Sequence, residues 1–329
     1  MNELERVRGL SAIFGGAADG RVLVGIGDDA AVLAGSEDPL VWTIDAAVEG
    51  VHFRRAWLSF EDIGYRSTMA AVSDLGAMGA EPLGVLSALV LPGDVDDEAL
   101  FALARGQRDA AIACGTAVIG GNLARGAELS ITTTVLGRSK RALRRSGARP
   151  GDALWLAGPV GLAAAGLRVL RAGLGAESGA ARASIEAWRR PRARIADGLA
   201  IRDAATAAVD VSDGLARDVG HVARASEVVI VIDRAIFDDA PASGDDPLRR
   251  DALRAAAAEV GARPSDLALS GGEDYAIAFT ARDGEAFPFA VRIGEVEALE
   301  GRPAGVWVRE KDGSFRALAE GGFDHFTPG

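Results

Sequence analysis

Residues 25–32 read GIGDDAAV, and residues 43–53 read TIDAAVEGVHF. In each stretch a short apolar run leads into aspartate, at Asp28 and Asp29 in the first and at Asp45 in the second. Such runs are typical of buried strands. A carboxylate at the mouth of a buried strand loses water, so it requires a cation or several hydrogen-bond donors. Converging aspartates would make an oxygen-lined site suited to Mg²⁺, whereas an isolated Asp-Asp pair is more typical of a capped turn.

Further carboxylates stand in comparable apolar settings. Asp74 lies in the middle of MAAVSDLGAM, within a helix predicted over residues 60–79. It either contacts a metal or ligand, or is an exposed or locally capped aspartate. Asp210 and Asp213 follow a predicted strand in AAVDVSDGLA, and Glu273 lies in the turn ALSGGEDY. The repeated pattern favours a shared acidic site.

Glycine turns and a basic segment suggest a phosphate ligand. The strand predicted over residues 116–119 should end in GGN at residues 120–122, where the backbone can approach a phosphate. Residues 158–161, GPVG, are either an anion site at a helix N-terminus or a plain turn. Residues 138–149 hold six basic side chains, which either bind polyphosphate or form a solvated face near a linker.

Composition limits the class of protein. A chain of 329 residues, 49% hydrophobic and 25% charged, is typical of a globular protein of two domains. A net charge of −11 argues against a nucleic-acid partner. One cysteine and three scattered histidines make a disulfide and a zinc site poor explanations. A charged N-terminal stretch and the lack of an apolar run of about 18 residues predict a cytoplasmic protein without a membrane span.

Strand and helix patterns mix along the whole chain, so the predicted class is α/β or α+β. One predicted helix covers residues 191–205 and begins with proline. The chain has no Gly-x-x-x-x-Gly-Lys-Ser/Thr loop, no Ser-His-Asp order and no Cys-His pair. The residues therefore predict metal-dependent phosphoryl chemistry, with a nucleotide polyphosphate held through several Mg²⁺ ions and without a P-loop.

Seven motifs, in order, resemble those of thiamine-monophosphate kinases, a family related to aminoimidazole ribonucleotide synthetase. They are GIGDDAA (25–31), Asp45 with His52-Phe53, VSDLGAMGA (72–80), RSGARPGD (145–152), DVSDGLA (210–216), LSGGEDY (269–275) and GFDHF (322–326). The resemblance implies transfer of the γ-phosphoryl group of ATP to thiamine monophosphate, giving thiamine diphosphate. It also implies two domains, residues 1–139 and 140–329, and a homodimer in which the N-terminal sheets form a barrel, with active sites at the interface.

The resemblance also assigns roles to single residues. It implies Mg²⁺ ligation by Asp29, Thr43, Ile44, Asp45, Asp74, Asn122, Asp210 and Asp213, ATP contacts from Gly121, Asn122, Arg145 and Ser212, and thiamine monophosphate contacts from His52, Glu273 and Phe323. Asp45, Asp74, Asp210 and Arg145 are the expected catalytic residues. The acceptor phosphate is already an anion, so direct transfer needs no general base and no covalent intermediate.

Two positions depart from the family pattern. Asn122 replaces the usual metal-binding aspartate, and Ile44, which offers only its carbonyl oxygen, replaces the usual threonine or serine. Two alternatives therefore stay open: another ATP-dependent enzyme of the superfamily with a different acceptor, and a nucleotide-binding relative without catalytic activity.

Overall fold

The computed structural model describes residues 1–15, 20–241 and 246–318. Phe323 lies outside the described residues. The chain divides into two units: unit 1 is Met1–Leu75 with Ala80–Ala142, and unit 2 is Gly76–Gly79 with the chain from Leu143 onward. The expected domain boundary after residue 139 lies close to the end of unit 1 at Ala142. Within the described part of the chain, none of the helices is both long and apolar enough to cross a membrane.

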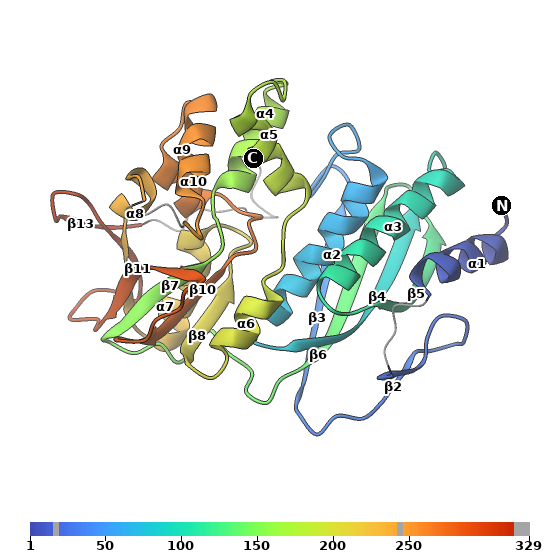
Figure 1. Ribbon diagram of the computed structural model, residues 1–329, viewed down its shortest axis with the longest axis horizontal. Helices are drawn as coiled ribbons and strands as arrows, with labels where there is room; N and C mark the ends of the chain where they lie inside the picture. The colour runs from blue at the N-terminus through green and yellow to red at the C-terminus, as the bar shows by residue number, and fades with distance from the viewer. Residues whose placement is uncertain (16–19, 242–245, 319–329) are drawn as a thin grey trace. The chain divides into compact units, whose positions relative to one another are not determined.

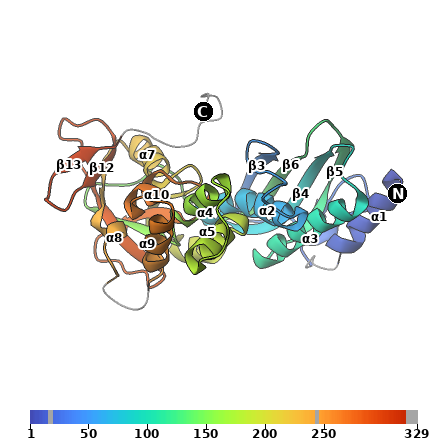
Figure 2. The ribbon, with the colours of Figure 1, turned by 90° about the horizontal axis from the view of Figure 1, so that it is seen from above.

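Unit 1 consists of an open four-stranded sheet with helices on one side. Its elements are α1 (Glu3–Phe14), β1 (Val22–Val24), β2 (Val32–Leu33), β3 (Leu40–Val48), α2 (Phe60–Ala77), β4 (Glu81–Leu91), α3 (Asp97–Ala113), β5 (Val118–Arg125) and β6 (Ser130–Arg138). The strand order is β3-β6-β4-β5, with only β4 and β5 parallel, and β1 and β2 form a separate ladder. Figures 1 and 2 show α1, α2 and α3 on the same side of this sheet, which does not close into a barrel.

Close backbone contact holds α2 against α3. A Cβ on Gly64 would lie 2.0 Å from the Leu103 carbonyl oxygen, and a Cβ on Gly106 would lie 1.9 Å from the Glu61 carbonyl oxygen. Only glycine permits this approach. The N-terminus of α3 is capped by the Asp96 carboxylate, which accepts from the Ala99 amide at 2.8 Å. The crossing fixes α2, and with it Asp74, over the sheet.

Strand β3 corrects the first prediction about the two acidic stretches. The apolar run forms a strand, but Asp45 lies inside it and the strand is not buried. Leu40, Trp42 and Ile44 are 61%, 73% and 67% exposed. The apolar pattern indicates a need for burial, and in this single chain β3 is an edge strand whose outer face has no cover. The predicted strand end at Gly120 and Gly121 is also wrong, because β5 continues through both to Arg125.

Unit 2 is built on a seven-stranded sheet of order β13-β12-β9-β11-β7-β10-β8, in which only β9 and β12 pair in parallel. Its elements are β7 (Asp152–Ala157), α4 (Leu162–Arg171), α5 (Gly179–Arg189), α6 (Ile195–Ile201), β8 (Ala205–Asp210), α7 (Leu215–Ser226), β9 (Val229–Asp233), α8 (Ala235–Asp238), α9 (Arg250–Glu259), α10 (Pro264–Ser270), β10 (Ile277–Arg282), β11 (Ala290–Glu297), β12 (Gly305–Arg309) and β13 (Phe315–Ala317). With mostly antiparallel sheets, the mixed class leans toward α+β.

Apolar clusters cover both faces of this sheet. On one face, helices α4, α7, α9 and α10 contribute to a large cluster that includes Leu162, Leu215 and Leu253. On the other, Phe287 packs edge-on against Trp155 and Phe279, with ring centroids 5.3 and 4.9 Å apart. The helix predicted over residues 191–205 is shorter, only Ile195–Ile201. The alanines after it join β8, because pairing with β10 outweighs their helix propensity.

Candidate functional site

Asp45 and Asp74 belong to the helix-covered face of the unit 1 sheet. The Thr43 hydroxyl on β3 donates to the Asp74 carboxylate on α2 at 2.5 Å. Because side chains alternate along a strand, Asp45 shares this face with Thr43. Asp45 is exposed, and one of its oxygens accepts from the Ala46 amide at 2.8 Å. The structure therefore associates three predicted site residues, with both carboxylates on the α2 side of one strand.

Asp29 lies in the exposed connection between β1 and β2. The Asp29 amide donates to the neighbouring Asp28 carboxylate at 2.9 Å. No group of three or more histidine, cysteine, aspartate or glutamate side chains is arranged around a metal position within the described residues. Asp29 therefore does not form a three-carboxylate group with Asp45 and Asp74.

His52 occupies the turn that follows β3. Its Nδ1 accepts from the Val48 amide at 3.1 Å, which orients the ring relative to the strand end. The next residue, Phe53, is buried and anchors the turn. Ile44 presents an exposed side chain on the opposite face from Thr43 and Asp45. Among the residues predicted around β3, only Ile44 has its side chain on the uncovered face.

Gly121 and Asn122 are on β5, the other edge of the same sheet. The pairing register aligns Asp45, Thr133, Ser87 and Gly121 in one row across the four strands. A Cβ on Gly121 would lie 2.0 Å from the Ser87 carbonyl oxygen, so glycine is required there. Three strand spacings of about 4.8 Å separate β3 from β5, or about 14 Å in all. Asp45 and Asn122 of one chain therefore cannot bind the same Mg²⁺ ion.

In unit 2, Asp218 organises the loop that carries Ser212 and Asp213. Its carboxylate accepts from the amides of Ser212, Asp213 and Gly214 at 3.0, 3.0 and 3.1 Å. Burial raises the pKa of Asp218 to about 7, although the three amide bonds favour the charged form. Since Asp218 already occupies these amides, Ser212 can contact a nucleotide only through its hydroxyl or carbonyl. Asp210 is buried at the end of β8, immediately before this loop.

The loop carrying Glu273 is hydrogen-bonded to the Ser212 loop. The Glu273 amide donates to the Ser212 carbonyl at 2.7 Å, and the Tyr275 amide donates to the Val211 carbonyl at 2.9 Å. Glu273 and Tyr275 have φ angles of 66° and 53°, a backbone conformation that is unfavourable for residues other than glycine. A predicted acceptor contact and a predicted nucleotide contact thus lie on two loops joined backbone to backbone.

Asp274 caps helix α4. Its carboxylate accepts from the Gly161 amide at 2.6 Å and from the Ala163 amide at 3.1 Å. Burial raises the pKa of this carboxyl to about 7. The two amide bonds lower the pKa, and the negative charge of the neighbouring Glu273 raises it further. A carboxylate thus already fills the helix N-terminus at residues 158–161. Of the two interpretations of GPVG, the structure favours the turn over an anion site.

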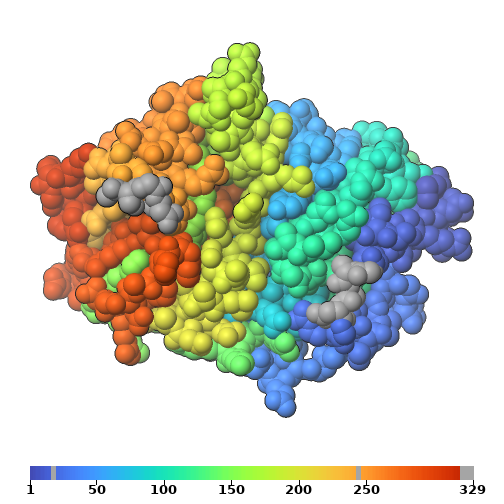
Figure 3. Space-filling view, viewed as in Figure 1, coloured from blue at the N-terminus to red at the C-terminus, as the bar shows by residue number. Residues whose placement is uncertain are grey.

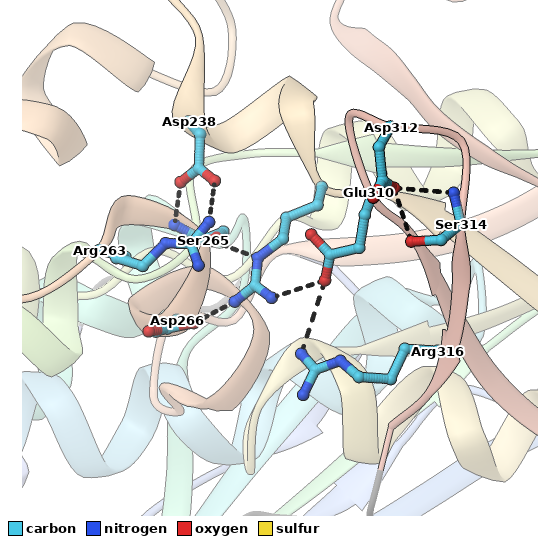
Figure 4. Close-up of polar contacts among 9 residues, drawn as sticks. Asp238, Arg263, Ser265, Asp266, Glu310, Asp312, Ser314 and Arg316 are labelled. Atoms are coloured by element: carbon cyan, nitrogen blue, oxygen red, sulfur yellow. Dashed lines mark hydrogen bonds and ion pairs between the residues drawn. The ribbon is translucent and has the colours of Figure 1, made fainter.

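Helix α10, which leads into the Glu273 loop, is anchored by Arg234. Figure 4 shows this cluster: the buried guanidinium donates to the Ser265 hydroxyl at 2.8 Å, to Asp266 and to Glu310 at 3.1 Å. Asp238 accepts from the Ser265 amide at 3.0 Å. These bonds fix the first turn of α10, and α10 ends at Ser270, three residues before Glu273.

Arg145 is exposed and lies beside helix α7. The Ser226 hydroxyl donates to the Arg145 carbonyl at 3.2 Å. The pKa of His221 on α7 is lowered, first by burial and then by the charges of Arg145, Arg224 and Arg217. Arg217 also pairs with Asp213 at 3.8 Å. The basic segment therefore continues, in three dimensions, onto α7.

Five contributors to this site were not among the predicted residues: Asp218, Asp274, Trp188, Arg217 and Arg234. Trp188 on α5 donates its indole N–H to the Glu273 carboxylate at 2.6 Å. Two of the five have local signals: Asp218 follows the Ser-Asp-Gly turn by four residues, and Arg217 follows Asp213 at i,i+4 spacing. The partners of Trp188, Asp274 and Arg234 are distant in the sequence, so no spacing rule reveals them.

Comparison with known proteins is consistent with this architecture. Residues 27–139 match the family model of the AIR synthase related protein N-terminal domain, and residues 149–302 match that of the C-terminal domain. Thiamine-monophosphate kinase of Escherichia coli K12 is 39% identical over 265 residues, 79% of this chain and 76% of the relative. The enzyme of Aquifex aeolicus is 33% identical over 278 residues, 84% of this chain and 87% of the relative.

Solved structures give the same result. The structure of AaThiL complexed with AMPPCP and TMP has a TM-score of 0.78 at 32% identity and covers 92% of each chain. Thiamine-monophosphate kinase from Stenotrophomonas maltophilia K279a has a TM-score of 0.78 at 33% identity, covering 94% of this chain and 96% of its own. The hydrogenase maturation protein HypE in complex with ATP, at 19% identity and a TM-score of 0.76, shares the fold. The chain therefore belongs to the thiamine-monophosphate kinase family of AIR synthase related proteins, and it is a kinase.

Proposed function

We propose that this kinase transfers the γ-phosphoryl group of ATP directly to the phosphate of thiamine monophosphate, giving thiamine diphosphate. The observation that carries the proposal is the 2.7 Å bond from the Glu273 amide to the Ser212 carbonyl. It holds the expected acceptor contact beside the expected nucleotide contact. The relatives support the choice of substrates, because they are named thiamine-monophosphate kinases and AaThiL was solved with AMPPCP and TMP.

The donor set suits Mg²⁺, which prefers charged oxygen ligands. No basic side chain of the described residues pairs with the exposed carboxylates of Asp29 and Asp45, and Asp74 is held by a neutral hydroxyl. The residues that would hold the ions are Asp29, Thr43, Ile44, Asp45 and Asp74 in unit 1, Asn122 on β5, and Asp210 and Asp213 in unit 2. Bound Mg²⁺ offsets the repulsion between two polyphosphate anions.

The chain's own residues bind and orient the two substrates. Arg145 and Ser212 contact the nucleotide, and the guanidinium of Arg145 matches the geometry of phosphate oxygens. Gly121 has no side chain, so the β5 backbone can come close to the nucleotide. His52, Glu273 and Phe323 contact thiamine monophosphate. Because the acceptor phosphate is anionic at neutral pH, none of these residues has to remove a proton, and catalysis rests on alignment and charge.

We also propose a homodimer that completes the sheet of unit 1 as a barrel shared by two chains. The support is the exposed apolar face of β3, formed by Leu40, Trp42 and Ile44 at an open sheet edge. The 14 Å between Asp45 and Asn122 adds to it, since residues on opposite edges can meet only across two chains. A kinase that uses ATP works where ATP is supplied, so we place the protein in the cytoplasm.

The test is thiamine diphosphate formation from thiamine monophosphate, ATP and Mg²⁺, with separate reactions that contain free thiamine or lack Mg²⁺. We expect product only from thiamine monophosphate with Mg²⁺ present, because its phosphate is already ionised, whereas the hydroxyl of free thiamine would have to lose a proton. Equal turnover of free thiamine would overturn the mechanism. ATP binding without any turnover would favour the non-catalytic alternative.

A further inference from the structure

Trp188 makes a partly buried, charge-assisted hydrogen bond to Glu273. Its indole Nε1 donates to the Glu273 Oε2 at 2.6 Å, and the tryptophan is 1% exposed. Trp188 belongs to the buried face of α5, with Ala181, Ser184 and Ile185 at helical spacing. Bonds between an N–H and a carboxylate are stronger away from water. The bond therefore holds one oxygen of the Glu273 carboxylate in place.

The backbone of Glu273 is held as firmly as its side chain. Its φ of 66° is unfavourable for glutamate, and its amide is bound to the Ser212 carbonyl. The next residue, Asp274, is bound to the first turn of α4. Helices α4 and α5 pack against each other, and Figure 3 shows their connection, coloured yellow-green, standing out from the surface of unit 2. One helix pair thus holds both carboxylates of the loop.

Charge decides which part of the acceptor Glu273 faces. A carboxylate repels a phosphate unless a cation lies between them. It attracts a positively charged nitrogen heterocycle and accepts from ring N–H donors. Glu273 remains half-buried rather than enclosed, so a ligand can reach it. Its place is therefore beside the organic, cationic part of thiamine monophosphate and not beside the transferred phosphoryl group.

We infer that Trp188 is a positioning residue that sets the Glu273 carboxylate for the cationic heterocycle of the acceptor and so determines acceptor affinity. The inference rests on the proposed function for the identity of the acceptor. Trp188 does not touch the reacting atoms, so its loss should raise the KM for thiamine monophosphate and leave the KM for ATP unchanged. If Trp188 served only packing, its replacement would lower stability and would change the KM for thiamine monophosphate and the KM for ATP alike, or neither.

Trp188→Phe removes the N–H and keeps an aromatic ring. We expect a KM for thiamine monophosphate about 10-fold higher, the loss typical of one hydrogen bond to a charged group, with kcat within about two-fold. Trp155→Phe is the matched control, because the buried Nε1 of Trp155 has no hydrogen-bond partner among the described residues. It removes an N–H of the same kind and should leave both KM values unchanged. An unchanged KM in Trp188→Phe, or an equal rise in Trp155→Phe, overturns the inference.

A spectroscopic measurement tests the contact without turnover. In ¹⁵N-labelled protein, the indole N–H signal of Trp188 is the one missing from Trp188→Phe. Its chemical shift should change in Glu273→Gln and again when thiamine monophosphate is added to the wild type, while the chemical shift of the Trp155 indole signal should stay the same. If Trp188→Phe fails to fold, site-specific labelling of Trp188 identifies the signal. A Trp188 signal that ignores Glu273→Gln overturns the inference. Wild-type turnover, measured first, tests the proposed function separately.

Discussion

Asp74 shows what a single hydrogen bond contributes at the scale of one residue. The Thr43 hydroxyl donates to the Asp74 carboxylate at 2.5 Å, a bond that orients the group without adding an opposite charge. Asp45, two residues along β3 from Thr43, is exposed on the same face. Two carboxylates on one face repel each other and attract a divalent cation.

Asp45→Asn and Asp74→Asn should each lower the rate of transfer at least about 100-fold, the loss typical of one preorganised electrostatic contact. Thermal unfolding without Mg²⁺ should occur at the same or a higher temperature, because a repulsive charge is gone. Initial rates and melting curves check both expectations. Asp109→Asn, at an aspartate on α3 that pairs with Arg108, is the control and should keep the wild-type rate. A wild-type rate in either site variant would remove that residue from the metal site.

Asn122→Asp should lower the Mg²⁺ concentration that gives half the maximal rate. The added charge on a Mg²⁺ ligand should contribute roughly 1–3 kcal/mol, or about 5- to 150-fold in affinity. Mg²⁺ titrations of both proteins measure this. Superimposable titrations would show that position 122 is not a ligand.

Buried charges decide how single elements are held. Arg234 fixes the first turn of α10 through Ser265, Asp266 and Glu310, with its side chain only 7% exposed (Figure 4). Asp218, in the first turn of α7, holds the loop that precedes this helix through backbone amides, and Asp274 holds the first turn of α4 in the same way. Each of these charges orders an element that ends or begins at the candidate site.

Arg234→Met should lower the free energy of unfolding by about 2–3 kcal/mol, because it leaves a buried hydroxyl and two carboxylates without their shared partner. Arg263→Met removes an arginine of the same cluster whose side chain is 60% exposed and pairs with Asp238 at 3.2 Å. That change should cost no more than about 0.5 kcal/mol. Urea unfolding of the three proteins makes the comparison. Equal losses in the two variants would show that the Arg234 contacts add nothing beyond a surface ion pair.

The Asp274 carboxyl predicts a pH dependence of stability. Its pKa is raised from 3.8 to about 7, first by burial, so the folded protein holds this proton more tightly than the unfolded chain. Its stabilising contribution is therefore complete below pH about 4, is lost as the pH rises to about 7, and is constant above that. Between these limits Asp274→Asn should lose less stability than the wild type. Urea unfolding across this pH range checks it, and parallel curves for the two proteins would contradict it.

At the scale of the molecule, each unit has its own sheet, and unit 1 leaves one sheet face without helices (Figure 2). That face carries the exposed apolar side chains of β3. In a protein with a net charge of −11, such a surface at a sheet edge supports the proposed pairing with a second chain.

Trp42→Lys should shift the protein from dimer to monomer, because it puts a charge on the most exposed apolar side chain of β3. Ile112→Lys is the control: Ile112 is 54% exposed on α3, on the side of the sheet already covered by helices. Sedimentation at micromolar concentration should give a dimer for the wild type and for Ile112→Lys. A wild-type monomer with full activity would contradict the shared barrel.

The sequence by itself determined the family to which the chain belongs, and it predicted the chemistry of the site and several elements around it. Apolar runs predicted β3 and β8, helix start signals predicted α2, and the acidic motifs marked Asp45, Asp74, Asp210 and Glu273 as candidates, because these signals are local. Only the tertiary structure decided that β3 is an exposed edge, that β5 continues through Gly121, and that Trp188 holds Glu273. Each of these depends on a partner far along the chain: strand order, register and the packing of α5 bring together residues that no spacing in the sequence relates.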